Sequence, residues 1–181
     1  KVSMDHIDAM AKSRFPGIDI RWAYSSRIVR EKLATQGTLI DSPAQALARM
    51  MDDGFTRVAV QSLHTIPGEE FHSLRKTVAS FEGMPKGMTR IELGEPLLSR
   101  SDDMERAAAA LLSSIPSDRD KKDAVIFMGH GTHHPANIYY PGMQYYLSRL
   151  DPLALVGTVE GSPSLDDVLL ALGKHKPQRV F

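Results

Sequence analysis

The chain contains no cysteine, and this absence excludes disulfide scaffolds, thiolate zinc sites, iron–sulfur clusters and cysteine nucleophiles. Net charge is also lacking, because 22 Lys and Arg balance 22 Asp and Glu, so we expect no nucleic-acid partner. No apolar run approaches the roughly 18 residues that a bilayer requires, so no membrane span is expected. What is present is typical of a globular domain, since 42% of the 181 residues are hydrophobic and 24% are charged.

Both ends of the sequence indicate an excerpt of a longer protein. The chain opens on Lys1 directly in sequence with helical spacing of its apolar residues, and it closes on Arg179-Val180-Phe181, which is typical of a strand cut short. The first residues lack the apolar core of a signal peptide, and a signal already removed would leave no trace. The compartment therefore stays open at this point.

Strand-like and helix-like segments alternate along the chain. Segments rich in β-branched and aromatic residues are 18–24, 57–62, 88–93, 124–128, 155–159 and 179–181. Segments with helical periodicity and helix-starting or helix-ending residues are 26–36, 43–54, 69–81, 102–114, 145–150 and 165–172. This alternation predicts an α/β fold with parallel strands covered by helices on both faces.

A faint internal repeat predicts how the chain divides. A Ser-Pro pair, a helix, a glycine and an Arg-Val strand occur once from Asp41 and again from Gly161. We therefore expect two similar doubly wound parallel-sheet halves around a cleft. Residues 1–120 would form the N-terminal half without its first strand, and residues 121–181 would begin a truncated, incomplete C-terminal half.

The sharpest chemical signal is His130, which ends a buried strand and lies between Gly129 and Gly131. Ligands of open parallel sheets bind outside the carboxyl ends of the strands, and glycines there let a ligand approach the backbone. An imidazole at that edge is suited to bind a metal or to act as a base. The alternative is a histidine that closes a tight turn.

Glu160 repeats this pattern thirty residues later, at the end of the next strand and before Gly161. One strand–helix–strand unit spans about 30 residues, so it would bring His130 and Glu160 to the same edge of the sheet. An imidazole and a carboxylate form a partial site for a first-row divalent metal, and a third ligand is expected from the part of the protein that this excerpt lacks. The alternative is that Glu160 only caps the next helix.

Two further clusters lie near these positions. Tyrosines 139, 140, 145 and 146 either stack on a large flat ligand or pack into the core. The segment 61–72 places His64 after a strand, Glu69 and Glu70 in the first turn of a helix, and His72 in that helix. Carboxylates are favoured at that end of any helix, and a lone His72 is more often a surface residue than a ligand. The adjacent His133 and His134 are interpreted as loop residues.

Three motifs in this order carry a family resemblance: VAVQSLHTIPGEEFH from Val58, VIFMGHG from Val125 and VGTVEGSPS from Val156. They resemble the anaerobic-type sirohydrochlorin cobaltochelatases of cobalamin biosynthesis, class II chelatases with the fold of ferrochelatase. The resemblance extends over essentially the whole chain. It implies a longer protein, with a further metal-binding histidine beyond Phe181.

The resemblance implies ATP-independent insertion of Co²⁺ into sirohydrochlorin. In that activity His130 and Glu70 would be catalytic, and His130 and Glu160 would bind the metal. The alternatives are insertion of Fe²⁺ for sirohaem and a non-catalytic tetrapyrrole or metal carrier. His72 is similar to a position in a periplasmic, haem-containing branch, where it would be an axial ligand of haem b at a subunit interface. A periplasmic homo-oligomer is therefore expected, with a cytoplasmic location as the alternative.

Overall fold

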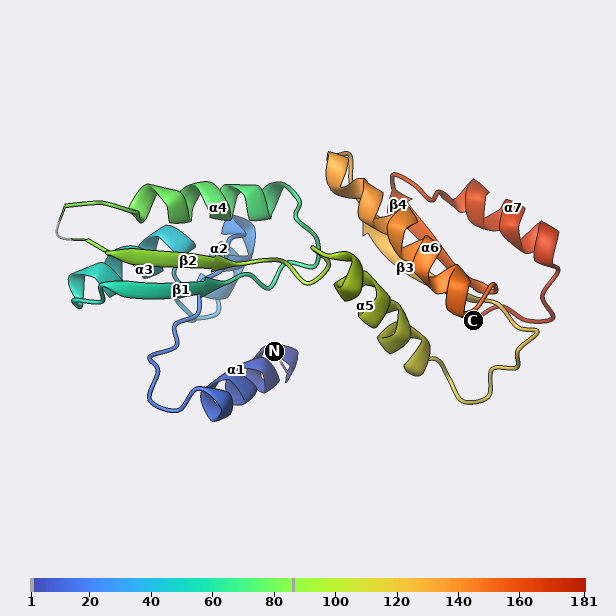
Figure 1. Cartoon of the computed structure of the whole chain (residues 1–181), viewed down its shortest axis with the longest axis horizontal. Helices are drawn as coiled ribbons and strands as arrows, with labels where there is room; N and C mark the ends of the chain where they lie inside the picture. The colour runs from blue at the N-terminus through green and yellow to red at the C-terminus, as the bar shows by residue number, and fades with distance from the viewer. Residues whose placement is uncertain (1, 86) are drawn as a thin grey trace. The chain divides into compact units, whose positions relative to one another are not determined.

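A computed structural model describes residues 2–85 and 87–181 of the chain, and its helices and strands are shown in Figure 1. The chain forms two compact units, one of residues 1–59 and 74–92 and the other of residues 60–73 and 93–181. Helices alternate with strands in two small sheets, so the predicted α/β class is confirmed. Among the described residues, no helix is both long enough and apolar enough to cross a membrane.

The first unit begins with three helices, α1 (Val2–Arg14), α2 (Arg27–Ala34) and α3 (Pro43–Asp52). Helix α3 starts where the Ser-Pro pair predicts, because Ser42 and Gln45 form a reciprocal capping box and Pro43 occupies the first turn. The strand predicted over 18–24 is wrong. Only Ala23 forms an isolated bridge there, to Asp41, and Ile18 is 65% exposed.

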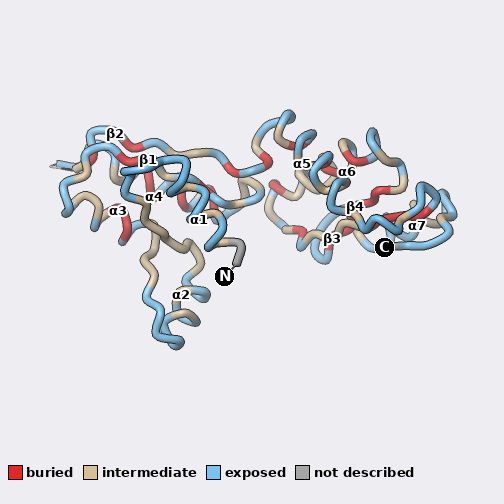
Figure 2. The backbone as a smooth tube through the Cα atoms, turned by 90° about the horizontal axis from the view of Figure 1, so that it is seen from below, coloured by how far each residue is buried: buried red, intermediate tan, exposed pale blue. Residues whose placement is uncertain are grey.

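The first sheet pairs β1 (Arg57–Gln61) with β2 (Arg90–Gly94), and helix α4 (Glu69–Phe81) lies between them in the chain. One face of each strand is buried, since Val58 and Ile91 are enclosed while the residues next to them are more exposed. Val78 of α4 and Leu47 of α3 are also buried apolar residues of this unit. Figure 2 shows how buried positions recur along these strands and helices.

The second unit contains α5 (Ser101–Ser113), β3 (Val125–Gly131), a short 3₁₀ helix η1 (Pro135–Ile138), α6 (Tyr139–Leu150), β4 (Ala154–Glu160) and α7 (Leu165–His175). Strands β3 and β4 are parallel neighbours, with Val125 opposite Ala154 and Gly131 opposite Glu160. Their buried face joins α5 and α6 in one apolar core made of Leu98, Met104, Ala108, Val125, Met143, Leu147, Ala154 and Val156.

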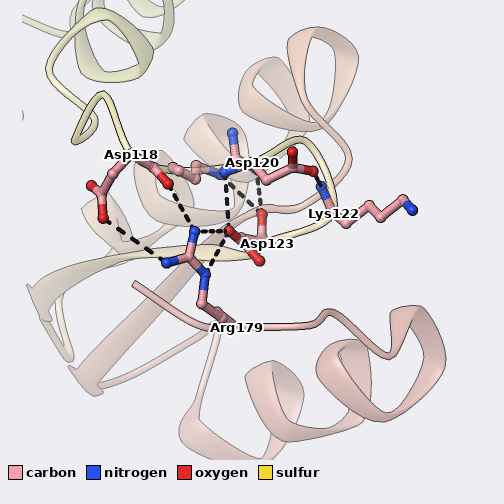
Figure 3. Close-up of polar contacts among 6 residues, drawn as sticks. Asp118, Asp120, Lys122, Asp123 and Arg179 are labelled. Atoms are coloured by element: carbon pink, nitrogen blue, oxygen red, sulfur yellow. Dashed lines mark hydrogen bonds and ion pairs between the residues drawn. The ribbon is translucent and has the colours of Figure 1, made fainter.

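The last residues of the chain pair with the far edge of β3, because Ala124 and Val180 form a parallel bridge. Arg179 stabilises this pairing (Figure 3). Its Nε and Nη2 donate to one carboxylate oxygen of Asp123 at 3.0 and 2.7 Å, and its Nη2 also donates to the carbonyl of Asp118. Asp123 is 1% exposed, so Arg179 neutralises a buried charge at the start of β3.

Candidate metal centre

The carboxyl ends of β3 and β4 bring His130 and Glu160 to the same end of one sheet. His130 is the penultimate residue of β3 and Glu160 is the last residue of β4, and both side chains are exposed. The strands approach closely here, as shown by the space at Gly131, where a Cβ would lie only 1.4 Å from the carbonyl oxygen of Glu160. Gly131 also has φ +78°, a backbone conformation that favours glycine. Glycine is therefore required at position 131 for the two ends to meet.

A depression of about 540 Å³ opens at these strand ends. It is lined by Glu69, His130, Gly131, Thr132, His133, His134, Pro135 and Glu160. Both predicted metal ligands thus face one solvent-accessible hollow, together with one carboxylate and two imidazoles that the sequence interpretation did not place there. A second hollow, about 400 Å³, lies along α6, β4 and α7 and is lined in part by Gln144, Asp167 and His175.

The hydrogen bonding of His130 determines which of its ring nitrogens can bind a metal. Nδ1 lies 3.1 Å from the carbonyl oxygen of Gly131, and a carbonyl oxygen can only accept. Nδ1 therefore carries the hydrogen, which leaves the lone pair on Nε2 in the neutral ring. A histidine that donates through one nitrogen to a backbone carbonyl and presents the other is the usual arrangement of a metal ligand.

His134 has the opposite arrangement. Its Nδ1 accepts a hydrogen bond from the backbone N–H of Ala136 at 3.1 Å, which caps η1. The hydrogen of the neutral ring must then be on Nε2, so His134 offers a donor where His130 offers a lone pair. Of these two lining histidines, only His130 keeps the lone pair of its neutral ring on Nε2.

The other residues singled out from the sequence, His64, Glu70 and His72, are not among the residues that line the depression. His72 is half-buried, and its ring meets that of His134 edge-on, with centroids 5.2 Å apart. Glu70 is exposed on α4, whereas its neighbour Glu69 is the carboxylate that lines the depression. His64 hydrogen-bonds through Nδ1 to Ser62 Oγ at 2.8 Å.

Within residues 2–85 and 87–181, no three His, Asp or Glu side chains form a group that could hold a metal ion. His130 and Glu160 offer one imidazole and one carboxylate on adjacent strands. A metal bound by two such donors would keep coordination positions open for water or for a second molecule.

The tyrosine cluster mainly belongs to the core. Tyr139, Tyr140 and Tyr146 pack against the apolar cluster of the second unit, whereas Tyr145 is 60% exposed. The ring of Tyr140 also lies over Gly129, where a Cβ would come within 2.3 Å of its Cε1 atom. Of the two interpretations that the sequence left open, core packing therefore applies to three of the four tyrosines.

Comparison with known proteins agrees with the resemblance of the three motifs. The family described as cobalt chelatase (CbiK) matches residues 1–181. The chain belongs to the cobalt chelatase (CbiK) family. It is 46% identical over 164 residues to the sirohydrochlorin cobaltochelatase CbiKC of Nitratidesulfovibrio vulgaris, covering 90% of this chain and 57% of that protein.

A second relative in this family is more distant. The chain is 35% identical over 158 residues to the sirohydrochlorin cobaltochelatase of Salmonella typhimurium, covering 87% of this chain and 58% of that protein. The chain therefore spans a little under three fifths of the length of both curated relatives.

Proposed function

We propose that the protein to which this chain belongs is a sirohydrochlorin cobaltochelatase, which inserts Co²⁺ into sirohydrochlorin without ATP. The observation that carries this proposal is the pairing of His130, with its Nε2 lone pair free, and Glu160 at one open depression. Membership of the cobalt chelatase family and the names of the two relatives support the choice of metal and substrate.

The reaction needs a site that holds a metal ion only until the macrocycle takes it. Co²⁺ and sirohydrochlorin give cobalt-sirohydrochlorin and two protons, so two pyrrole N–H bonds break as the metal–nitrogen bonds form. His130 Nε2 and a Glu160 oxygen would bind Co²⁺ and replace part of its water shell. Two protein donors leave the remaining positions for water and then for the ring nitrogens.

The two released protons need an acceptor close to the ring. The carboxylate of Glu69 lines the depression and is exposed, so it would accept a pyrrole proton and pass it to solvent. The family resemblance assigns the acidic role to Glu70, the next residue of α4. Both carboxylates are therefore proposed catalytic residues, and position in the structure favours Glu69.

An optical assay of the full-length protein tests this function. Sirohydrochlorin changes its absorption when a metal enters the ring, and the assay is run with Co²⁺ and with Fe²⁺ in parallel. The proposal predicts many turnovers per protein with Co²⁺. A preference for Fe²⁺ would instead favour sirohaem formation, since nitrogen and oxygen donors accept either ion. Stoichiometric binding without release would identify a carrier and overturn the proposal.

For His72 the resemblance supports a finer proposal, axial ligation of haem b in a periplasmic homo-oligomer. The half-buried imidazole of His72 offers one nitrogen donor, as an axial ligand must, although its ring already contacts His134. A Soret band in the haem-supplemented full-length protein, lost in His72→Ala, would support this role, and no band in the wild type would overturn it. Cell fractionation and size-exclusion chromatography test the compartment and the oligomer.

A further inference from the structure

One side chain, that of Asn137, links the two loops that follow His130 and Glu160. Asn137 lies in η1, which follows β3. Its Oδ1 accepts from the backbone N–H of Thr132 at 3.3 Å, and its Nδ2 donates to the carbonyl of Ser162 at 2.8 Å. Thr132 is two residues after His130, and Ser162 is two residues after Glu160. A single amide therefore spans the gap between the two strand ends.

The amide of Asn137 can make this bridge in only one orientation. If the amide were flipped, its NH₂ group would face the N–H of Thr132, so that two donors would meet. Its oxygen would face the carbonyl of Ser162, so that two acceptors would meet, and neither hydrogen bond could form. The loop after β4 also lies close in space to the Asn137 amide. Gly161 has φ +106°, and a Cβ on it would lie 2.4 Å from Oδ1 of Asn137. The side chain of Asn137 therefore occupies the space that a side chain at position 161 would need, so this contact requires glycine there.

The β3–β4 register extends only as far as Gly131 and Glu160, so the sheet itself does not hold the loops beyond them. The loop after β4 is held by its own hydrogen bonds to the strand. The N–H and Oγ1 of Thr158 in β4 both donate to the carbonyl of Pro163 in this loop, at 2.8 and 2.9 Å, so the loop turns back onto the end of β4 and is closed there. Only the Asn137 amide then ties this closed loop to the loop after β3, among the hydrogen bonds found for the described residues.

We infer, on the basis of the proposed function, that Asn137 is a positioning residue that fixes the two loops beyond His130 and Glu160 and thereby holds these two side chains in the orientation that metal binding requires. Donor groups must lie within about 0.5 Å of the productive geometry, and neighbouring residues that support a metal site usually change affinity or activity by about 10–100-fold when lost. Asn137 does not line the depression, and it acts on the metal through the two loops that it joins.

The test compares Asn137→Ala with a matched control, Gln144→Ala, in the full-length protein. Gln144 also makes two hydrogen bonds to strand backbone, from its Nε2 to the carbonyl of Ala154 at 3.0 Å and to its Oε1 from the N–H of Val156 at 2.6 Å. These bonds lie towards the other end of β4. Both variants lose side-chain support of β4 or its loop, and only Asn137→Ala loses it beside the metal ligands.

We expect Asn137→Ala to raise the KM for Co²⁺ about 10–100-fold, with the KM for sirohydrochlorin unchanged. Gln144→Ala should lower the thermal midpoint and leave the KM for Co²⁺ at the wild-type value. If the alanine variant fails to fold, Asn137→Leu fills the same space without the two hydrogen bonds and should give the same shift.

Two outcomes would contradict this inference, and they are distinguishable. An active wild type, with a KM for Co²⁺ that Asn137→Ala changes no more than Gln144→Ala does, would overturn the role of Asn137 alone. A wild-type protein that neither binds nor inserts Co²⁺ would overturn the proposed function, and the positioning role with it.

Discussion

Replacing Gly131 by alanine tests the close approach of β3 and β4 that places His130 beside Glu160. In the structure an added Cβ would lie 1.4 Å from the Glu160 carbonyl oxygen and 3.0 Å from Thr158 Cβ. The strand ends would have to separate by about 1.6 Å to bring the first contact to 3.0 Å, the shortest that real Cβ atoms show. The residue also has φ +78°, where an L side chain costs roughly 1–2 kcal/mol.

These two effects predict separate losses in Gly131→Ala. The backbone strain and the displaced strand end should together lower the free energy of unfolding by at least about 2 kcal/mol. A misplacement of about 1 Å in a reacting site costs about 100-fold in rate, so cobalt insertion should fall by at least that factor. Denaturant unfolding and the optical insertion assay measure the two quantities on the same preparations.

Gly173→Ala is the matched control for this substitution. Gly173 lies in α7, and a Cβ there would meet no atom within 4 Å. Alanine in a helix is favoured over glycine by about 0.5–1 kcal/mol, so this variant should be slightly more stable and fully active. Wild-type stability and wild-type insertion in Gly131→Ala would refute the close approach of the strands and the metal geometry built on it.

Three further predictions follow from individual side chains. His130→Ala should abolish insertion while the circular dichroism spectrum stays that of the wild type, because the side chain is exposed; wild-type rates would remove it from the mechanism. Glu69→Gln should lower kcat more than Glu70→Gln does, since only Glu69 lines the depression, and the reverse order would restore the role that the resemblance gives to Glu70. The hydrogen bonds from Arg179 hold the pKa of Asp123 below its usual 3.8, so the pair stabilises the fold above that pH and loses this effect as the pH falls through the lowered pKa. Arg179→Met should therefore lower the thermal midpoint at neutral pH, with a difference from wild type that shrinks in acid; a pH-independent difference would contradict the ion pair.

The sequence predicted the elements best where local signals and burial agree. Helix α4 has the predicted bounds, and β3 and β4 lie where apolar runs end in a polar residue and a glycine. The 18–24 segment has the composition of a strand, but a strand also needs a neighbouring strand to pair with. Among the described residues, the backbone of this segment forms a single isolated bridge, between Ala23 and Asp41.

Helix α6 begins six residues earlier than predicted, at Tyr139 rather than Tyr145. Proline is tolerated in the first turn of a helix because the N–H groups there have no intrahelical partner, and Pro141 is the third residue of α6. This extension carries Tyr139 and Tyr140 into the core, which composition alone could not decide.

At the candidate site, the sequence predicted the pair His130 and Glu160 but not the residues around it. The order of strands in one βαβ unit is enough to bring the two together. The choice between Glu69 and Glu70 depends on the rotation of α4, which turns by about 100° per residue, and periodicity does not fix it that closely. His134 was missed because its cap on η1 depends on the conformation of the loop.

The most direct test of the account is anomalous diffraction at the cobalt edge from crystals of the full-length protein grown with Co²⁺. We predict a cobalt peak at coordination distance, about 2.0–2.2 Å, from His130 Nε2 and from a carboxylate oxygen of Glu160. Cobalt bound elsewhere, for example between His72 and His134, with neither His130 nor Glu160 in contact, would contradict the account.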